Sequence, residues 1–181
     1  MTVIAVSFGS NINRESNIRT SVNEIRARYP QAIFSPVFKS EAVGFKGPYF
    51  LNLVATYQSD LGIQDVLSEL HRIEDQLGRE RSKDEMLSRT IDLDLLLYGE
   101  GIFYDQGFDV PRKEILVSAH VLKPLSDILP NMVHPVIGEP LGALWDKTPG
   151  PKKALLTEAP VTPSAGYSQG IAVLPPSTLI T

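Results

Sequence analysis

Cysteine is absent from the 181-residue chain, and its absence excludes two kinds of site. Without thiols the protein has no disulfide framework and no thiolate ligands for a metal ion. A metal would need carboxylate, histidine or carbonyl ligands. Long apolar runs are also missing, since none approaches the roughly 18 residues that a membrane span needs. The apolar N-terminus, MTVIAVSFGSN, lacks the basic leader and cleavage site of a secretory signal. We therefore expect a cytoplasmic protein that does not bind membranes.

An excess of positive charge is missing too. The chain has 17 Lys and Arg against 21 Asp and Glu, a formal net charge of −4 at pH 7, and an isoelectric point of about 5.4. Nucleic-acid-binding proteins usually carry a clustered basic surface, so we expect small-molecule ligands and no nucleic acid. The balance still permits a small anionic substrate held by a local group of arginines.

Hydrophobic periodicity predicts an α+β fold. Apolar residues recur at helical spacing over 13–29 and 63–77, and short helices are expected near 122–128 and 141–145. Strands are expected at 3–8, 32–39, 50–58 and 90–98, with Pro36 marking an edge or a bulge. The order strand, helix, strand, strand, helix, strand is typical of an antiparallel sheet with the helices packed on one face, related to the split βαβ pattern.

Two segments do not fit this pattern. The charged stretch RERSKDEMLSR, residues 79–89, is long for a connection and lacks an apolar period, which is typical of a functional or mobile loop. After Trp145 the composition changes, and residues 149–181 are rich in Pro, Gly, Ser and Thr. We expect a domain at residues 1–148 followed by a flexible tail at 149–181.

The stretch RTIDLDLLLYG, residues 89–99, places two carboxylates in the most apolar run of the chain. Because side chains alternate along a strand, Ile91, Leu93, Leu95 and Leu97 are expected in the core. Asp92 and Asp94 would then project together from the other face, with Cα atoms roughly 6.6 Å apart. Two carboxylates so close repel one another unless a cation lies between them. Mg²⁺ prefers such oxygen ligands together with substrate phosphates, and two metal ions could be bridged.

Several basic residues lie just upstream of the two aspartates: Arg79, Arg81, Lys83 and Arg89. Arginine suits bidentate contacts with phosphate, and phosphoryl transfer needs mainly metal ions, cationic contacts and positioning. The alternative is a solvated acidic pair that forms salt bridges with these arginines. The spacing alone leaves both interpretations open. Flat aromatic faces and an amide that could hold a heterocycle are available at Tyr49, Phe50 and Asn52.

Six segments, one of them the stretch with the two aspartates, strengthen the first interpretation. They are GSN at 9–11, FLNLV at 50–54, RIEDQLGRERS at 72–82, RTIDLDLLLYG at 89–99, VP at 110–111 and LKPLSDILP at 122–130. Together they resemble the 6-hydroxymethyl-7,8-dihydropterin pyrophosphokinase family of folate biosynthesis, over residues 2 to about 135. The resemblance implies a ferredoxin-like fold, a monomer, and transfer of pyrophosphate from ATP to the hydroxymethyl group of the dihydropterin, giving AMP.

The resemblance also implies roles for individual residues. Two Mg²⁺ ions would be held by Asp92 and Asp94, which with Arg79 and Arg89 form the catalytic set. The expected ATP-binding residues are Arg79, Arg81, Arg89 and Arg112. The expected pterin-binding residues are Ser40, Val43, Phe50, Asn52 and His120.

The sequence departs from the family pattern inside the site, so we expect a divergent member. The usual W-G-P-R is replaced by MLSR, with Met86 in place of the tryptophan that closes over the pterin and Leu87 and Ser88 in place of the Gly-Pro turn. Further on, Arg112 takes a histidine position, Ser118 an arginine position, and His120 that of a stacking phenylalanine.

Three functions remain open on these departures. One is a pyrophosphokinase with the usual substrate. The second is a relative that uses another pterin or a related hydroxymethyl compound, and the third is a non-catalytic binding protein on the same fold. An RNA-binding module on a similar sheet would show exposed aromatic residues where this chain has aspartates, so we set it aside.

Overall fold

The computed structural model describes residues 1–41, 46–78, 91–150 and 157–158. Its elements are, in chain order, β1 (Thr2–Ser10), α1 (Arg14–Arg28), β2 (Ile33–Phe34), β3 (Phe38–Ser40), β4 (Phe50–Ser59), α2 (Ile63–Gln76), β5 (Asp92–Tyr98), the 3₁₀ helix η1 (Tyr104–Gln106), α3 (Glu114–Val117), α4 (Ala119–Ile128), α5 (Leu141–Asp146) and β6 (Thr157–Glu158). The helices and strands expected from periodicity all form, with shifted ends and with one expected strand divided in two.

The strands of the described chain form a single antiparallel sheet in the order β5-β1-β4-β3-β6, and β2 also pairs with β4. With β2 and β3 taken together as one interrupted strand, the elements from β1 to β5 follow the order strand, helix, strand, strand, helix, strand of the split βαβ pattern, which confirms the ferredoxin-like antiparallel sheet. Pro36 lies in the break between β2 and β3, both of which pair with β4. The expected strand at 32–39 is therefore two short strands, because proline cannot donate to a ladder.

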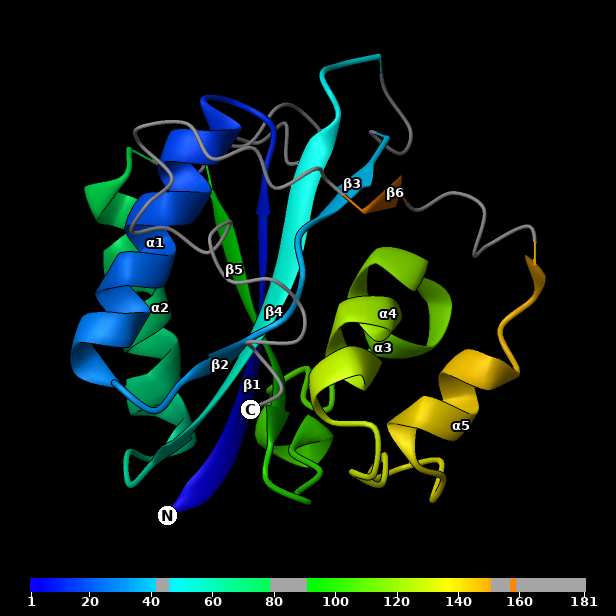
Figure 1. The fold of residues 1–181 in the computed structure, drawn as a ribbon. Coiled ribbons are helices and arrows are strands. Elements are labelled where there is room, and N and C mark those ends of the chain that lie inside the picture. Colours follow the sequence, from blue (N-terminus) through cyan, green and yellow to red (C-terminus); the bar gives the residue numbers. More distant parts are fainter. Residues whose placement is uncertain (42–45, 79–90, 151–156, 159–181) are drawn as a thin grey trace.

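Helices cover both faces of this sheet (Figure 1). The long helices α1 and α2 pack on one face, where their apolar stripes meet Ile4, Phe8 and Leu53 in the larger core cluster. The short helices α3, α4 and α5 cover the other face and form a second cluster around Ala5, Val54 and Leu97. The expectation that both long helices pack on one face is confirmed, and the short C-terminal helices add a cover on the other face. The central strands carry apolar side chains on both faces, so both faces need a cover.

A β-bulge in β5 explains one wrong side-chain assignment. Ala5 lies opposite Leu97 whereas Val6 lies opposite Leu95, so Leu96 is an extra residue in the pairing. An extra residue reverses the alternation beyond it. Leu97 was expected beside Leu93 and Leu95 but packs on the other face, with Leu96.

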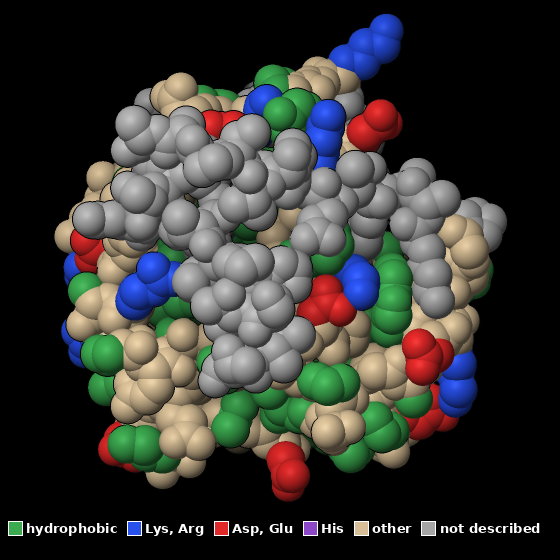
Figure 2. Space-filling view, viewed as in Figure 1, with side chains coloured by type: hydrophobic (Ala, Val, Ile, Leu, Met, Phe, Trp, Pro, Cys, Tyr) green, Lys and Arg blue, Asp and Glu red, His purple; other side chains and the backbone are tan. Residues whose placement is uncertain are grey.

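Two residues of the expected tail form part of the sheet. In β6, Thr157 pairs with Lys39 and Glu158 pairs with Phe38 of β3. The rest of 151–181 lies outside the described residues, so the boundary at 148 and the flexibility of the tail stay predictions. Among the residues coloured by type on the face in Figure 2, acidic and basic side chains are interspersed. No helix in the described part of the chain is long and apolar enough to cross a membrane.

Candidate active site

Four strands contribute one residue each to a row across the sheet. Asp92 of β5 pairs with Gly9 of β1, Gly9 pairs with Asn52 of β4, and Asn52 pairs with Phe38 of β3. Directly paired residues in antiparallel strands project to the same face. Asp92 and Asn52, predicted to bind metal and pterin, therefore stand on one face with only a glycine between them. Two strand spacings separate them by roughly 9.5 Å.

Gly9 leaves the middle of this row open. A Cβ atom at this position would lie 3.5 Å from Oδ1 of Asn52 and 4.0 Å from Cδ1 of Phe50. The amide oxygen and the phenyl edge therefore border the space above Gly9. This arrangement gives a flat floor flanked by a carboxylate, an amide and an aromatic ring.

The second aspartate lies in the next row on the same face. Asp94 pairs with Ser7, which pairs with Val54 of β4. The predicted common face of Asp92 and Asp94 is thus correct, and both side chains are half-buried. This face is the one covered by α3 to α5, and the aspartates lie in the first three residues of β5.

Asp94 lies in a strongly electronegative environment. Burial raises the pKa of its carboxyl to about 7, the Asp92 charge adds to the rise, and Arg112 opposes it. Glu74 and Glu114 raise the pKa further. Nη2 of Arg112 lies 3.2 Å from Oδ1 of Asp94. The site therefore favours a bound cation, and Arg112 supplies one positive charge.

The two aspartates fit a hard divalent cation by their chemistry, because they offer closely spaced carboxylate oxygens and few other donors. No group of three or more His, Asp or Glu side chains among the described residues is arranged to hold a metal ion. An ion at Asp92 and Asp94 would complete its coordination with water and with oxygens of a substrate, as Mg²⁺ commonly does.

Glu74 of α2 fixes β5 from its outer edge. The side chain is 1% exposed, and its Oε1 accepts a hydrogen bond of 2.8 Å from the backbone N–H of Leu93. Leu93 lies between the two aspartates, so this bond holds the strand where they project. The motif that contains Glu74 was recognised in the sequence, but no role was assigned to it. Its position four residues after Leu70, on the apolar stripe of α2, was the available signal.

The pterin-side residues meet on β3 and β4. Asn52 is 7% exposed, and its Nδ2 donates to Oγ of Ser40 at 2.7 Å. This bond orients the amide. Tyr49, one position before Phe50, packs on the opposite face against the larger core cluster, with Arg14 and Lys39 over its ring. Alternation along the strand thus leaves Phe50 at the site and excludes Tyr49.

The sequence of the chain matches a known protein family. Residues 5–130 match the family described as 7,8-dihydro-6-hydroxymethylpterin-pyrophosphokinase (HPPK). The chain belongs to this family. It is 30% identical over 145 residues to the 2-amino-4-hydroxy-6-hydroxymethyldihydropteridine pyrophosphokinase of Haemophilus influenzae, covering 75% of this chain and 86% of that protein. The enzyme of the same name from Aquifex aeolicus is 29% identical over 78% of this chain and 89% of its own length.

Some HPPK relatives are much longer. The folic acid synthesis protein fol1 of Pneumocystis carinii is 33% identical over 147 residues, but this chain spans only 20% of its length. Among solved structures, an HPPK-DHPS of Plasmodium falciparum with pterin and p-hydrobenzoate has a TM-score of 0.62 at 10% identity, over 87% of this chain and 47% of that one. That likeness shows the shared fold alone.

Family membership confirms the prediction from the sequence motifs. HPPK enzymes transfer pyrophosphate from ATP to a hydroxymethyl dihydropterin in folate biosynthesis. The assignment of individual residues to roles is a separate question, and it depends on the geometry.

His120, at the position of the stacking aromatic residue, is half-buried on α4. This helix packs on β4 and β3, the strands that carry Asn52 and Ser40. Burial lowers the pKa of His120, although the Glu114 charge opposes the shift. The neutral imidazole is thus favoured, and its planar ring could stack on a heterocycle.

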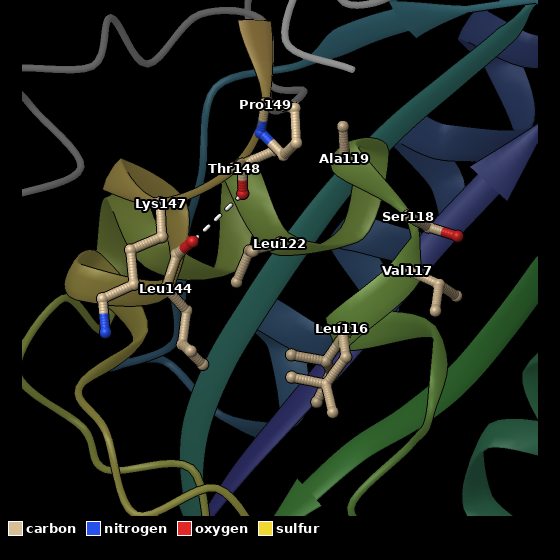
Figure 3. A pocket seen from close by; sticks show the side chains of 10 residues that line it. Leu116, Val117, Ser118, Ala119, Leu122, Leu144, Lys147, Thr148 and Pro149 are labelled. Atoms are coloured by element: carbon tan, nitrogen blue, oxygen red, sulfur yellow. Dashed lines mark hydrogen bonds between the residues drawn. The ribbon is translucent and has the colours of Figure 1, made fainter. Parts of the chain in front are cut away.

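Ser118, which the sequence comparison above predicts to replace an arginine, lies at the junction of α3 and α4. It borders a small cavity of about 160 Å³ between these helices and α5, lined mainly by apolar side chains that include Leu116, Val117 and Leu144. Figure 3 shows this cavity with Thr148 bonded to the backbone of Leu144 at its rim. Neither aspartate lines it. Lys147 also lines the cavity, and its ammonium group pairs with Glu139. Arg112, in contrast, forms an ion pair with Asp94.

The remaining predicted site residues lie outside the described residues. These are Val43 of the pterin side and the phosphate arginines Arg79, Arg81 and Arg89, together with the divergent Met86, Leu87 and Ser88. Their roles stay predictions.

Proposed function

We propose that this protein transfers pyrophosphate from ATP to 6-hydroxymethyl-7,8-dihydropterin on the sheet face that carries Asp92, Gly9 and Asn52. The observation that supports this assignment is the row itself, which sets the aspartates and the pterin-side amide on one face, either side of an open glycine. In the transfer, the hydroxymethyl oxygen attacks the β-phosphorus of ATP. The bond from that phosphorus to the oxygen on the α-phosphate breaks, AMP leaves, and the hydroxyl proton is released.

The position of each residue determines whether we assign it to the pterin or to the phosphates. Asn52, oriented by Ser40, presents its amide oxygen beside Gly9, where it can accept hydrogen bonds from the N–H groups of a pterin. Phe50 and His120 offer flat faces to the ring. Arg112 lies beside Asp94 and can contact a phosphate, and we assign the same task to Arg79, Arg81 and Arg89 on the strength of the family resemblance.

Asp92 and Asp94 are the residues that would hold Mg²⁺, two ions being the number that the resemblance implies. Bound there, the metal would neutralise charge on the phosphates. We name no general base. The cytoplasmic location and the monomeric state are likewise proposals.

Release of AMP from ATP, MgCl₂ and 6-hydroxymethyl-7,8-dihydropterin tests the proposal. We expect AMP only when all three are present, and a loss of at least about 10²-fold in kcat for Asp92→Asn and Asp94→Asn, since each would weaken the hold on the metal ion that neutralises charge on the phosphates. Asp105→Asn, which removes an exposed carboxylate from η1, is the matched control and should retain activity.

Two negative results would have different meanings. If ATP binds in the presence of Mg²⁺ but no AMP forms, the site acts on another acceptor, and other hydroxymethyl pterins should be tried. If neither binding nor AMP is found, the aspartates belong to a non-catalytic protein on the HPPK fold.

A further inference from the structure

Arg112 lies between two carboxylates. Its Nη2 is 3.2 Å from Oδ1 of Asp94, and its Nε is 3.5 Å from Oε2 of Glu114. The side chains of Arg112 and Asp94 are 29% and 28% exposed, whereas that of Glu114 is 44% exposed. The guanidinium group of Arg112 thus forms ion pairs with two carboxylates, and only Asp94 is a predicted metal ligand.

The backbone of Arg112 is held by hydrogen bonds, whereas Nε of its side chain has none with any residue that the structure describes. Its backbone N–H donates to the carbonyl of Leu96 at 2.9 Å, which ties the residue to the bulge of β5, and its own carbonyl accepts from Ile115. At the other end, Nε of Arg112 and Oε2 of Glu114 are buried and form no hydrogen bond in the described part of the chain, although they face one another. Buried polar atoms without partners cost free energy. A small movement of the guanidinium towards Glu114 would pair them.

Asp94 cannot satisfy Arg112 and a divalent cation equally well. A cation at Asp94 would repel the guanidinium 3.2 Å away. Without an acceptor nearby, the displaced arginine would turn into water and be lost to the site. Among the described residues, Glu114 offers a carboxylate within reach of the guanidinium group.

We infer that Arg112 is a built-in counter-ion of Asp94, and that Glu114 is a positioning residue that receives the guanidinium when a divalent cation takes Asp94. Arg112 then remains beside the site, where it can contact the phosphates of a nucleotide. The inference rests on the proposed function for the assignment of a cation to Asp94. The inference concerns Arg112, which the sequence analysis predicts to take the place of a histidine in the family pattern.

Binding of Mn²⁺ alone, followed by the electron paramagnetic resonance signal of the free ion, tests the inference on the full chain. Arg112→Gln removes the competing charge, so we expect about five-fold tighter Mn²⁺ binding, the effect of a partly exposed ion pair. Glu114→Gln leaves Arg112 with Asp94 alone, so we expect about five-fold weaker binding. The matched controls Lys113→Gln and Asp105→Asn should bind as the wild type does.

The double variant separates positioning from simple charge. If Glu114 acts through Arg112, Glu114→Gln should have little effect in the Arg112→Gln background. An equal weakening in both backgrounds would overturn the positioning role, because Glu114 would then act only as a distant negative charge. A general structural defect would not tighten Mn²⁺ binding in one variant and weaken it in the other.

Two other results would also overturn the inference. One is Arg112→Gln that binds Mn²⁺ no more tightly than the wild type, and the other is a wild type that takes up no Mn²⁺. AMP release by the same preparation then shows whether the proposed function still stands. If AMP is released although Arg112→Gln does not change the Mn²⁺ affinity, the proposed function is intact and only the role of Arg112 is refuted.

Discussion

The carboxyl of Asp94, a predicted metal ligand, also makes the stability of the fold depend on pH. This carboxyl has a pKa of about 7 in the folded protein, raised from 3.8 mainly by burial. Between about pH 4 and 7 the folded protein therefore holds a proton that the unfolded chain has released. Raising the pH through this window lowers the free energy of unfolding, because the native state binds more protons than the unfolded state.

Replacing this carboxyl with a neutral amide should remove that penalty. We expect Asp94→Asn to match the wild type near pH 4 and to become more stable as the pH rises, by about 1–2 kcal/mol above pH 7. The full shift would give more, but the partial exposure of the side chain screens it. Urea unfolding at pH 5, 6, 7 and 8 in the presence of EDTA measures the difference.

Asp105→Asn serves as the control for that series, since it removes an exposed carboxylate from the same half of the chain. A stability difference between Asp94→Asn and the wild type that does not change with pH would show that burial does not disfavour the charge at Asp94.

The chemistry of individual residues could be predicted from the sequence only where neighbours along the chain determine it. The common face of Asp92 and Asp94 follows from strand alternation. The contact between Arg112 and Asp94 does not, because 18 positions separate the two residues and the Val110–Pro111 segment must first return the chain to β5. The sequence indicated a phosphate contact for Arg112 but gave no sign that it would meet Asp94 and Glu114.

At the scale of the elements, β5 depends on two features that periodicity cannot reveal. The bulge at Leu96 moves Leu97 to the second core, and a bulge depends on the pairing of two strands that are distant in the sequence. The bond from Leu93 to Glu74 likewise joins an outer strand edge to a helix. Strand alternation predicted the first part of β5 correctly and failed after the bulge.

Removing the Glu74 acceptor should loosen β5 at the site. Because the N–H of Leu93 would lose its partner, we expect Glu74→Ala to lower the free energy of unfolding by about 1–3 kcal/mol. We also expect the substitution to speed up hydrogen exchange at the Leu93 amide, relative to the wild type, more than at the inner amides of β4. Glu74→Gln keeps an oxygen acceptor and should lose less. Protection of the Leu93 amide that is unchanged in Glu74→Ala would show that the edge bond does not hold the strand.

At the scale of the whole molecule, the sheet has two different edges, and the site row runs between them. Asp92 stands on the edge strand β5, whereas Asn52 depends on Ser40 and Phe38 of β3, which β6 covers. The sequence predicted both long helices on one face, and the structure confirms this, but periodicity did not show where the short helices α3 to α5 would pack. These helices cover the apolar second face of the sheet, and the open edge of β3 pairs with two residues of the segment that was expected to be a tail.

Truncation separates the tail from its sheet contact. We expect a chain ending at 158 to keep the stability and the pterin KM of the full protein. A chain ending at 148 lacks β6 and should lose about 1 kcal/mol, the contribution of one or two backbone hydrogen bonds. Its pterin KM should rise by up to about five-fold, since β3 orients Asn52 through Ser40. The kcat should change little, because the aspartates lie on the other side of β4 and β1. Equal stability and equal KM in both truncations would show that β6 adds nothing to the site and that residues 1–148 are sufficient as the catalytic domain.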